Sequence, residues 1–382
     1  MARYSPEVVF DALAARPDGA AVLGLRGARI AVVGGFVRDS LIGREPREID
    51  LVIEGDVSSV AAKLGGRQTP HPAFLACHVA RDGWTIELTQ ARRERYARPG
   101  ALPIVQPASI EEDLARRDFS VNTIAVTLAD RRLIAPAGAL EDLSNGVLRV
   151  LHEDSFVDDP TRVMRLARYR ARLGFGVEPL TARLAELARL DTVSGARIGA
   201  ELRLIAGDDQ SLAALAQLRG KLPVALDLEL AARALALAPS DADRQLVVLA
   251  SILRDASEDW LESLELTARE RNAIGFAARG ERLAAEVGAA QTPGELAELL
   301  SPVPAEAAAV LGALGPAAAT RSWFEALRHV RLEISGDDLL AAGIPAGPQV
   351  GERLARTLRR KRDGLLVAGR QAELESALEA LP

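Results

Sequence analysis

A change of pattern part-way along the 382-residue chain constrains its fold most. Up to about residue 150, short β-rich runs alternate with turns and short helical stretches. From about Thr161 onward, long Ala-, Leu-, Arg- and Glu-rich segments carry apolar residues at i, i+3 and i+4, the periodicity of amphipathic helices. Breakers such as Pro223 and Pro302 divide these segments. The sequence therefore predicts an α+β head followed by an all-α remainder.

The same pattern predicts four parts. We expect a head with a small mixed sheet over residues 1–150, a helical neck over 151–206, a helical body over 207–330 and a helical tail over 331–382. Within the head, alternation and β-branched content predict individual elements. These are strands at Arg29–Val33, Ile49–Ile53, Thr85–Leu88 and Val121–Leu128, and helices at Phe36–Ile42 and Ser58–Leu64.

Composition excludes several classes of protein. With 48 % hydrophobic residues and a net charge of −6, the chain is typical of a globular protein and not of a disordered one. It has no run of about 20 apolar residues and no apolar export signal, so we expect a soluble, cytoplasmic protein with no membrane partner. No obligate protein partner is evident. One cysteine and four histidines argue against a disulfide framework or a Cys/His metal cluster, which leaves carboxylates as metal ligands.

Two fragments of the head carry chemistry. A predicted strand ends in Gly34-Gly35 and opens a short helix, which allows the backbone to approach a phosphate closely. Glu48 and Asp50 belong to the next strand, and alternation places both carboxylates on one face. Such a pair repels unless a divalent cation lies between its members. Taken alone, each fragment is more often a tight turn or a solvated strand edge.

Two further runs extend this pattern. Residues 112–122 read Glu-Asp-Leu-Ala-Arg-Arg-Asp-Phe-Ser-Val-Asn, and residues 158–168 read Asp-Asp-Pro-Thr-Arg-Val-Met-Arg-Leu-Ala-Arg. In the second run Asp159 and Arg162 are three residues apart, and on a helix they would share one face. A surface ion pair is the commoner explanation of that spacing alone.

In this order, and with similar runs at residues 193–202 and 334–351, the motifs resemble the bacterial-type (class II) tRNA nucleotidyltransferase and poly(A) polymerase family. The resemblance extends from about residue 29 to 370. It implies template-independent addition of CCA, or of its terminal A, to the 3′ end of the tRNA acceptor stem. The implied substrates are CTP and ATP, and the implied cofactor is Mg²⁺ or Mn²⁺. A poly(A) polymerase and a CC-only adding enzyme remain alternatives, although the full length of the segment 92–111 favours addition of A or CCA.

The resemblance also implies roles for individual residues. Glu48 and Asp50 would be the catalytic, metal-binding carboxylates, and Asp159 with Arg162 would read the Watson–Crick edge of the incoming base. The full implied nucleotide-binding set is Gly34, Gly35, Arg38, Arg117, Asn122, Asp159, Arg162, Arg165 and Arg168. Glu87 is equally compatible with a third carboxylate and with a surface residue.

Glu48 departs from the family pattern, which has aspartate at that position. The extra methylene of glutamate displaces a bound metal unless the strand compensates, and reacting groups tolerate only about half an ångström of misplacement. A catalytically impaired RNA-binding relative is therefore a further alternative.

A cluster of basic residues lies near the C-terminus. It contrasts with the acidic whole, and it is a reasonable electrostatic footprint for an A-form acceptor stem, which proteins recognise by shape and backbone contacts. A plain solvated basic helix is an equally good explanation. The candidate RNA-binding residues are Arg356, Arg359, Arg360, Lys361 and Arg362.

Overall fold

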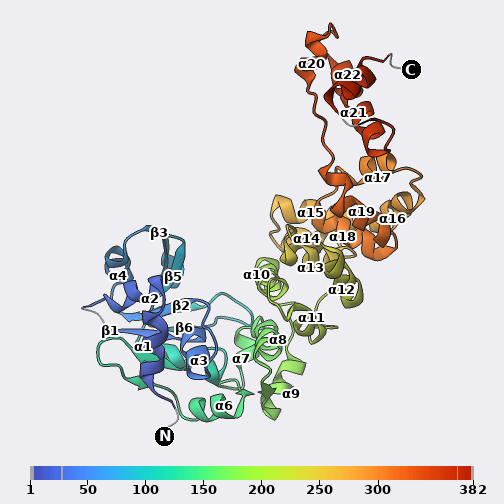
Figure 1. Cartoon of the computed structure of the whole chain (residues 1–382). Coiled ribbons are helices and arrows are strands. Elements are labelled where there is room, and N and C mark those ends of the chain that lie inside the picture. The colour runs from blue at the N-terminus through green and yellow to red at the C-terminus, as the bar shows by residue number, and fades with distance from the viewer. Residues whose placement is uncertain (1–3, 27–28, 368, 380–382) are drawn as a thin grey trace. The chain divides into compact units, whose positions relative to one another are not determined.

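The structure is a computed structural model that describes residues 4–26, 29–367 and 369–379. It confirms the mixed α+β head followed by helices (Figure 1). The chain divides into two compact units, Met1–Ser194 and Gly195–Pro382. The finer division at residues 150, 206 and 330 stays a prediction. Within the described ranges, no helix is both long and apolar enough to cross a bilayer.

The head is built on a seven-stranded mixed sheet with the order β3-β4-β5-β2-β1-β8-β9. Strands β2 and β5 are parallel, whereas all other neighbours in the sheet are antiparallel. The strands are β1 (Arg29–Val33), β2 (Ile49–Glu54), β3 (Arg67–His71), β4 (Ala76–Arg81), β5 (Trp84–Gln90), β8 (Ala125–Thr127) and β9 (Leu133–Ile134). The strands predicted at Arg29–Val33, Ile49–Ile53 and Thr85–Leu88 are thus confirmed.

Helices cover the central strands. Helix α3 contacts β1 and β2, and helix α5 contacts β2. Ile110 and Leu114 of α5 share a buried cluster with Val33 and Val52 of the sheet. The helices of the head are α1 (Pro6–Ala14), α2 (Pro17–Leu23), α3 (Gly35–Leu41), α4 (Val57–Leu64), α5 (Ile110–Ala115) and α6 (Ala139–Asn145), with 3₁₀ turns η1 (Pro72–Phe74) and η2 (Ser120–Asn122). Burial on both faces explains why β1 and β2 read as nearly continuous apolar runs.

The strand predicted over Val121–Leu128 is wrong in its first half. Residues 120–122 form the turn η2, and β8 begins only at Ala125. The hydroxyl of Thr123 donates to the carbonyl of Ser120 (2.7 Å), and the amide of Asn122 donates to Asp118 (2.9 Å). Such local bonds offer the backbone an alternative to a sheet ladder. The turn brings Asn122 to the end of β1, where Gly34 N donates to the carbonyl of residue 124.

Residues beyond the sheet complete the first unit. Strand β11 is a two-residue exception to the predicted all-α remainder, because it pairs with β10 in parallel. The segment 92–111 contains a hairpin of β6 and β7. These elements are β6 (Arg92–Arg95), β7 (Ile104–Pro107), β10 (Val147–Leu148), α7 (Ser155–Asp158), α8 (Arg162–Leu173), β11 (Gly176–Val177) and α9 (Pro179–Leu187).

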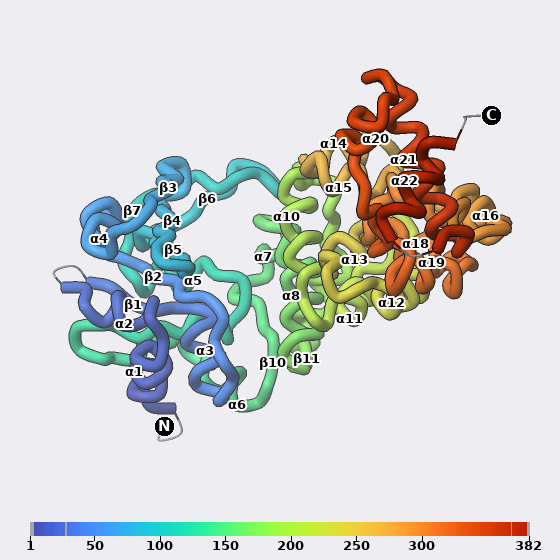
Figure 2. The backbone as a smooth tube through the Cα atoms, turned by 45° about the horizontal axis from the view of Figure 1, so that its top comes forward, coloured from blue at the N-terminus to red at the C-terminus, as the bar shows by residue number. Residues whose placement is uncertain are grey.

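The second unit is helical. Leu300, Leu311 and Phe324 belong to its main buried cluster, and Leu339 and Ala377 belong to a smaller cluster near the C-terminus. Helices α20, α21 and α22 lie together around this smaller cluster (Figures 1 and 2). The helices are α10 (Gly195–Ala206), α11 (Ser211–Ala216), α12 (Leu228–Leu237), α13 (Arg244–Leu253), α14 (Glu258–Ser263), α15 (Ala268–Ala278), α16 (Gly280–Ala289), α17 (Pro293–Leu300), α18 (Ala305–Leu314), α19 (Ala317–Glu325), η3 (Leu327–His329), α20 (Gly336–Ala341), α21 (Pro348–Arg362) and α22 (Arg370–Leu378).

Helix α21 docks on the first turn of α17. The backbone N–H of Gly294 donates to the Asp363 carboxylate (2.6 Å), and Arg359 forms ion pairs with Glu295 (3.1 Å) and Glu298 (3.0 Å). A Cβ at Gly294 would lie 2.5 Å from Cγ of Arg359 and 2.9 Å from the Asp363 carboxylate. The close approach of α21 therefore requires glycine at this position.

We expect Gly294→Ala to destabilise the second unit by about 1–3 kcal/mol, because the added methyl group overpacks the α17–α21 contact. The matched control is Gly275→Ala on α15, where an added Cβ meets nothing within 4 Å. The control should be neutral or stabilising by up to about 1 kcal/mol, since alanine has the higher helix propensity. Urea unfolding of the full chain, followed by tryptophan fluorescence, measures both. Equal midpoints for the two variants would contradict the prediction.

Candidate active site

The turn between β1 and α3 brings three predicted residues together. Gly34 has a positive φ of 70°, a conformation that favours glycine. A Cβ at Gly34 would lie 3.2 Å from a terminal nitrogen of Arg117 and 3.8 Å from the carboxylate of Asp50. Gly35 begins α3 directly after this turn. The turn, the β2 carboxylate and one guanidinium group therefore meet in one place.

Asp50 lies among carboxylates. In the parallel pairing of β2 and β5 it is in register with Glu87. The pKa of Asp50 is raised to about 7, first by burial and then by the negative charges of Glu87 and Glu48, against the opposing effects of Arg117 and Arg165. Glu87 is thus the third carboxylate of this group, which the sequence left open because it does not give the pairing of β2 with β5.

Glu48 does not occupy the predicted strand position. Strand β2 begins at Ile49, so Glu48 precedes the strand and is exposed. The alternation argument, which placed Glu48 and Asp50 on one strand face, thus extends one residue beyond β2 and stays a prediction. Their proximity nevertheless holds, since the charge of Glu48 acts on the pKa of Asp50.

The donor chemistry of this group fits a hard divalent cation. Asp50, Glu48 and Glu87 present oxygen ligands, and a cation would favour the ionised form of Asp50 that burial and like charge disfavour. Across the residues that the structure describes, no three carboxylate, histidine or cysteine side chains converge as a ready-made metal cluster. The residues thus fit Mg²⁺ or Mn²⁺ by chemistry, and Asp50 is the central ligand candidate.

Arg38 lies beneath the turn and does not face solvent. Its side chain is 1 % exposed, and it donates to Asp39 (2.8 Å) and to the amide oxygen of Asn122 (2.5 Å). The second oxygen of Asp39 accepts from Arg172 of α8 (2.8 Å). Arg38 thus links α3, η2 and α8. Its geometry is that of a positioning residue and not of a residue that contacts a nucleotide directly, as the resemblance implied.

Asp118 continues this buried chain to α8. It accepts hydrogen bonds from Asn122 (2.9 Å), from the backbone of Phe119 (2.8 Å) and from Arg165 (2.8 Å). Burial alone would raise the pKa of Asp118, but Arg165 and the Asn122 amide outweigh it and lower the pKa to about 2. The carboxylate is therefore ionised throughout the physiological range.

Tyr169 gathers three of the predicted arginines around one ring. The guanidinium carbons of Arg168, Arg38 and Arg165 lie 5.0, 5.3 and 5.7 Å from the ring centroid. Arg165 also donates to the Tyr169 hydroxyl (3.2 Å). The sequence motif contained these arginines, but it gave no sign that an aromatic ring organises them.

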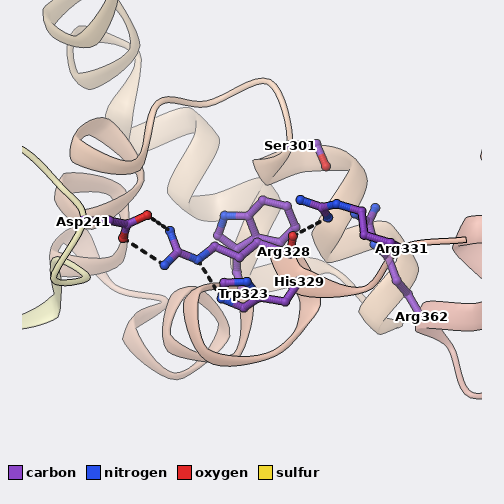
Figure 3. A pocket seen from close by; sticks show the side chains of 7 residues that line it. All are labelled: Asp241, Ser301, Trp323, Arg328, His329, Arg331 and Arg362. Atoms are coloured by element: carbon purple, nitrogen blue, oxygen red, sulfur yellow. Dashed lines mark hydrogen bonds and ion pairs between the residues drawn. The ribbon is translucent and has the colours of Figure 1, made fainter.

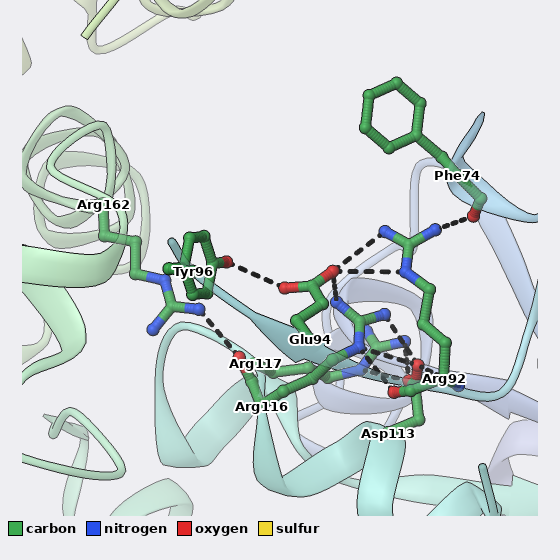
Figure 4. Close-up of polar contacts among 8 residues, drawn as sticks. All are labelled: Phe74, Arg92, Glu94, Tyr96, Asp113, Arg116, Arg117 and Arg162. Atoms are coloured by element: carbon green, nitrogen blue, oxygen red, sulfur yellow. Dashed lines mark hydrogen bonds and ion pairs between the residues drawn. The ribbon is translucent and has the colours of Figure 1, made fainter. Parts of the chain in front are cut away.

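Arg117 belongs to a second network that reaches the β6–β7 hairpin (Figure 4). Asp113 is fully buried and accepts from both Arg116 (2.6 Å) and Arg117 (3.1 Å). Arg116 donates to Glu94 of β6 (2.6 Å), and Glu94 accepts from the Tyr96 hydroxyl (2.8 Å). Through Asp113, the hairpin is thus connected to the guanidinium group beside Gly34.

The structure corrects the predicted arrangement of Asp159 and Arg162. Asp159 has extended backbone angles between α7 and α8, and its carboxylate accepts from the backbone and hydroxyl of Thr161 (3.0 and 2.6 Å). Arg162 begins α8, is buried, and donates to the Ser155 hydroxyl (2.6 Å) and the Arg116 carbonyl (2.7 Å). The two residues therefore do not share a helix face, because Pro160 follows Asp159 and prevents helical geometry there.

Comparisons with known proteins indicate the class to which the head is similar. A mixed sheet with a glycine turn after β1 and carboxylates on neighbouring strands defines a head of the nucleotidyltransferase class. The family model for the poly A polymerase head domain matches residues 30–149. Similar structures include a CCA-adding enzyme in an apo form, with a TM-score of 0.73 and 26 % identity over 99 % of this chain and 97 % of the other. The Thermotoga maritima CCA-adding enzyme complexed with tRNA has a TM-score of 0.68 and 25 % identity over 99 % and 96 %.

Curated relatives give the same class. An A-adding tRNA nucleotidyltransferase of Halalkalibacterium halodurans is 39 % identical over 49 % of this chain and 47 % of its own length. A CC-adding tRNA nucleotidyltransferase of Deinococcus radiodurans is 38 % identical over 46 % and 49 %. Residues 30–149 of the chain thus match the poly A polymerase head domain, and the chain is similar to tRNA nucleotidyltransferases and CCA-adding enzymes. It spans less than half the length of these curated relatives in the matched regions.

We expect Asp118→Asn to destabilise the first unit by about 2 kcal/mol at pH 7, because the low pKa of Asp118 stabilises the folded state when the carboxylate is ionised. This stabilisation is complete well above the unfolded pKa of about 4 and is lost as the pH falls toward 2. The gap between wild type and variant should therefore halve by about pH 3. Urea unfolding at pH 7, 5 and 3, followed by circular dichroism, measures the gap, and a gap independent of pH would contradict the assigned pKa.

Proposed function

We propose that the chain is a template-independent nucleotidyltransferase that adds CCA, or its terminal A, to tRNA 3′ ends. The observation that carries the proposal is Asp50, held in register with Glu87 while Gly34 and Arg117 lie against it. The named relatives, which include A-adding and CC-adding enzymes, support the substrate class. The full-length 92–111 segment favours A or CCA over CC alone. A cytoplasmic location remains a prediction.

In the proposed reaction a 3′-hydroxyl attacks the α-phosphorus of CTP or ATP. A new P–O bond forms, the bond to pyrophosphate breaks, and the hydroxyl proton is lost to solvent or a nearby base. A divalent cation on Asp50, with Glu48 or Glu87, would stabilise the charge at the phosphate. Arg117 would contact the triphosphate directly, since its guanidinium lies beside the open glycine turn.

The remaining predicted residues divide by their exposure. Arg38 and Asn122 act as positioning residues, because their polar groups bind each other beneath the turn. Arg165 and Arg168, next to the Tyr169 ring, supply positive charge on the α8 side. Both pairs would serve nucleotide binding. Arg38 and Asn122 would hold the glycine turn in place, and Arg165 and Arg168 would supply positive electrostatic potential at the site.

Base selection would depend on the connection between α7 and α8. Asp159 is half-buried, and both it and Arg162 act electrostatically on the Tyr96 hydroxyl. The Asp159 carboxylate has the acceptor chemistry that the amino group of C or A requires. Guanine and uracil present a carbonyl at the corresponding position and would be rejected.

A catalytically impaired RNA-binding relative is the second candidate function. The position of Glu48 outside β2, exposed to solvent, favours it, because the first carboxylate is then held less firmly than Asp50. A poly(A) polymerase and a CC-only enzyme differ from the main proposal in the RNA end and the nucleotide. One assay separates most of these: Mg²⁺ and tRNAs that end in the discriminator base, C or CC are incubated with labelled CTP or ATP. Incorporation on none of them would overturn addition to tRNA ends and favour the RNA-binding candidate.

We expect Asp50→Asn to lower nucleotide incorporation at least a thousandfold while tRNA affinity changes less than twofold. The amide keeps the shape of the side chain but removes the charge that a metal requires. Single-turnover incorporation and filter binding measure the two quantities. Activity within a few-fold of wild type would remove Asp50 from the catalytic role.

Glu48→Asp and Glu48→Gln then test the departure from the family pattern. If Glu48 ligates a metal, the aspartate variant retains or raises the rate, and the glutamine variant nearly abolishes it. If wild type and both variants show the same negligible turnover with equal tRNA binding, the enzyme proposal fails.

We expect Asp159→Asn to relax discrimination against GTP and UTP by about 1–3 kcal/mol, the usual value of one lost base-edge contact. Asparagine keeps an oxygen for the Thr161 backbone, so the chain should fold normally. The neighbouring Asp158→Asn is the matched control. Incorporation of each NTP, measured as kcat/KM, gives the ratio. A uniform loss for all four nucleotides would mean that Asp159 is structural.

A further inference from the structure

The structure sorts the basic residues predicted to bind RNA. Most of them form hydrogen bonds or ion pairs within the second unit. Arg356 donates to the carbonyls of Ser376 and Glu379, Arg359 pairs with Glu295 and Glu298, Arg360 pairs with Glu379, and Lys361 donates to Glu373 and to the Arg331 carbonyl. These contacts hold α21 against α17 and α22. The ion pairs neutralise Arg359, Arg360 and Lys361, whereas Arg356 is held by α22 and does not line the pocket described below.

Arg362 differs from its neighbours. Within the described ranges no carboxylate forms an ion pair with it, and its buried Nε has no hydrogen-bond partner. Its guanidinium carbon lies 5.7 Å from the centroid of the Trp323 ring. An aromatic face orients a guanidinium group without cancelling its charge. Arg362 therefore presents an oriented positive charge.

Arg362 lines a pocket of about 370 Å³ together with residues of α19, η3 and the end of α17 (Figure 3). The lining residues are Asp241, Ser301, Trp323, Arg328, His329, Arg331 and Arg362. A volume of this size accommodates a phosphate group with its attached sugar. Each lining residue belongs to the second unit, so the pocket exists independently of the head.

Two guanidinium groups of the pocket lack a carboxylate partner within the described ranges. Arg328 is neutralised by Asp241, to which it donates twice (2.9 and 3.1 Å). Arg331 donates only to backbone carbonyls, those of Arg328 (2.5 Å) and Val330 (3.1 Å). Arg331 and Arg362 therefore both retain their net charge at the pocket.

These two charges repel each other. Burial lowers the pKa of Arg362, and the positive charge of Arg331 lowers it further. Glu298 acts in the opposite direction, but it is bound to Arg359. An anion between Arg331 and Arg362 would relieve the repulsion. The planar guanidinium fork matches phosphate geometry in particular.

We propose that this pocket binds a backbone phosphate of RNA through Arg331 and Arg362, with Trp323 as the surface that orients Arg362. The identity of the RNA as tRNA rests on the proposed function, whereas the phosphate chemistry does not. Free nucleoside triphosphates carry the same group, so the test must separate the two sources. Docking of α21 on α17 through Gly294 and Asp363 keeps Arg362 in place.

The first test measures tRNA binding by filter retention between 50 and 300 mM KCl for wild type, Arg331→Gln and Arg362→Gln. Each variant should bind roughly fivefold to tenfold more weakly at low salt. The slope of log Kd against log salt should fall by about 1, because a variant that makes one phosphate contact fewer releases fewer counterions on binding. Arg362→Lys should restore the slope. Arg282→Gln, on the exposed face of α16, removes equal charge and should change neither quantity. If both pocket variants behave like Arg282→Gln, the proposal is wrong.

The second test uses Trp323 as a reporter. In the full chain with Trp84→Phe and Trp260→Phe, tRNA should change the fluorescence of Trp323, and Arg331→Gln should remove the change. ATP or inorganic phosphate at millimolar concentration should leave it unaltered. A response to ATP that equals the response to tRNA would assign the pocket to free nucleotides and overturn the RNA proposal. The readouts do not depend on catalysis, so a failed incorporation assay and a failed pocket test are distinguishable.

Discussion

The geometry of the head depends on the hydrogen bonds that the buried guanidinium group of Arg38 makes. It binds Asp39 on its own helix and Asn122 of η2, while Asp39 also holds Arg172 of α8. Three segments far apart in sequence thus meet at one charge that water does not reach. Removal of one partner from such a buried pair costs about 3–5 kcal/mol, since the other charge is left uncompensated. The glycine turn is supported by this group, because a terminal nitrogen of Arg38 lies within 3.6 Å of the position that a Cβ of Gly35 would occupy.

This use of Arg38 decides which charges remain for a ligand. A guanidinium group bound to a buried carboxylate fixes the local geometry, but the pair has little net charge and adds little electrostatic potential at a ligand site. Arg117 both holds the structure together and faces the site: one of its nitrogens binds Asp113, and another terminal nitrogen lies beside Gly34. Elsewhere the molecule uses aromatic rings for the same purpose: Tyr169 packs against Arg168, and Trp323 packs against Arg362. A ring orients the cation and leaves its charge intact, which a carboxylate does not.

Much of the fold could be predicted from sequence, and much of the site could not. Apolar runs and glycine turns gave β1, β2, β5 and the long helices, because these depend on local periodicity. The role of Glu87 depends on which strand pairs with β2, a long-range property that no local pattern carries. The place of Asp159 was missed because helical spacing was read across Pro160. Glu48 was assigned to the strand although β2, as predicted, begins at the next residue.

The electrostatics of the basic tail also could not be predicted from sequence alone. A count of arginines gives the charge of a segment, but the field that a ligand experiences depends on how each charge is compensated. On α21, ion pairs with Glu295, Glu298, Glu373 and Glu379 neutralise Arg359, Arg360 and Lys361 and hold the helix against α17 and α22. At the pocket, positive charge persists on Arg362, which faces a ring, and on Arg331, which faces backbone carbonyls. An acidic protein can therefore hold RNA through a few uncompensated guanidinium groups, and their positions follow from tertiary contacts that composition does not reveal.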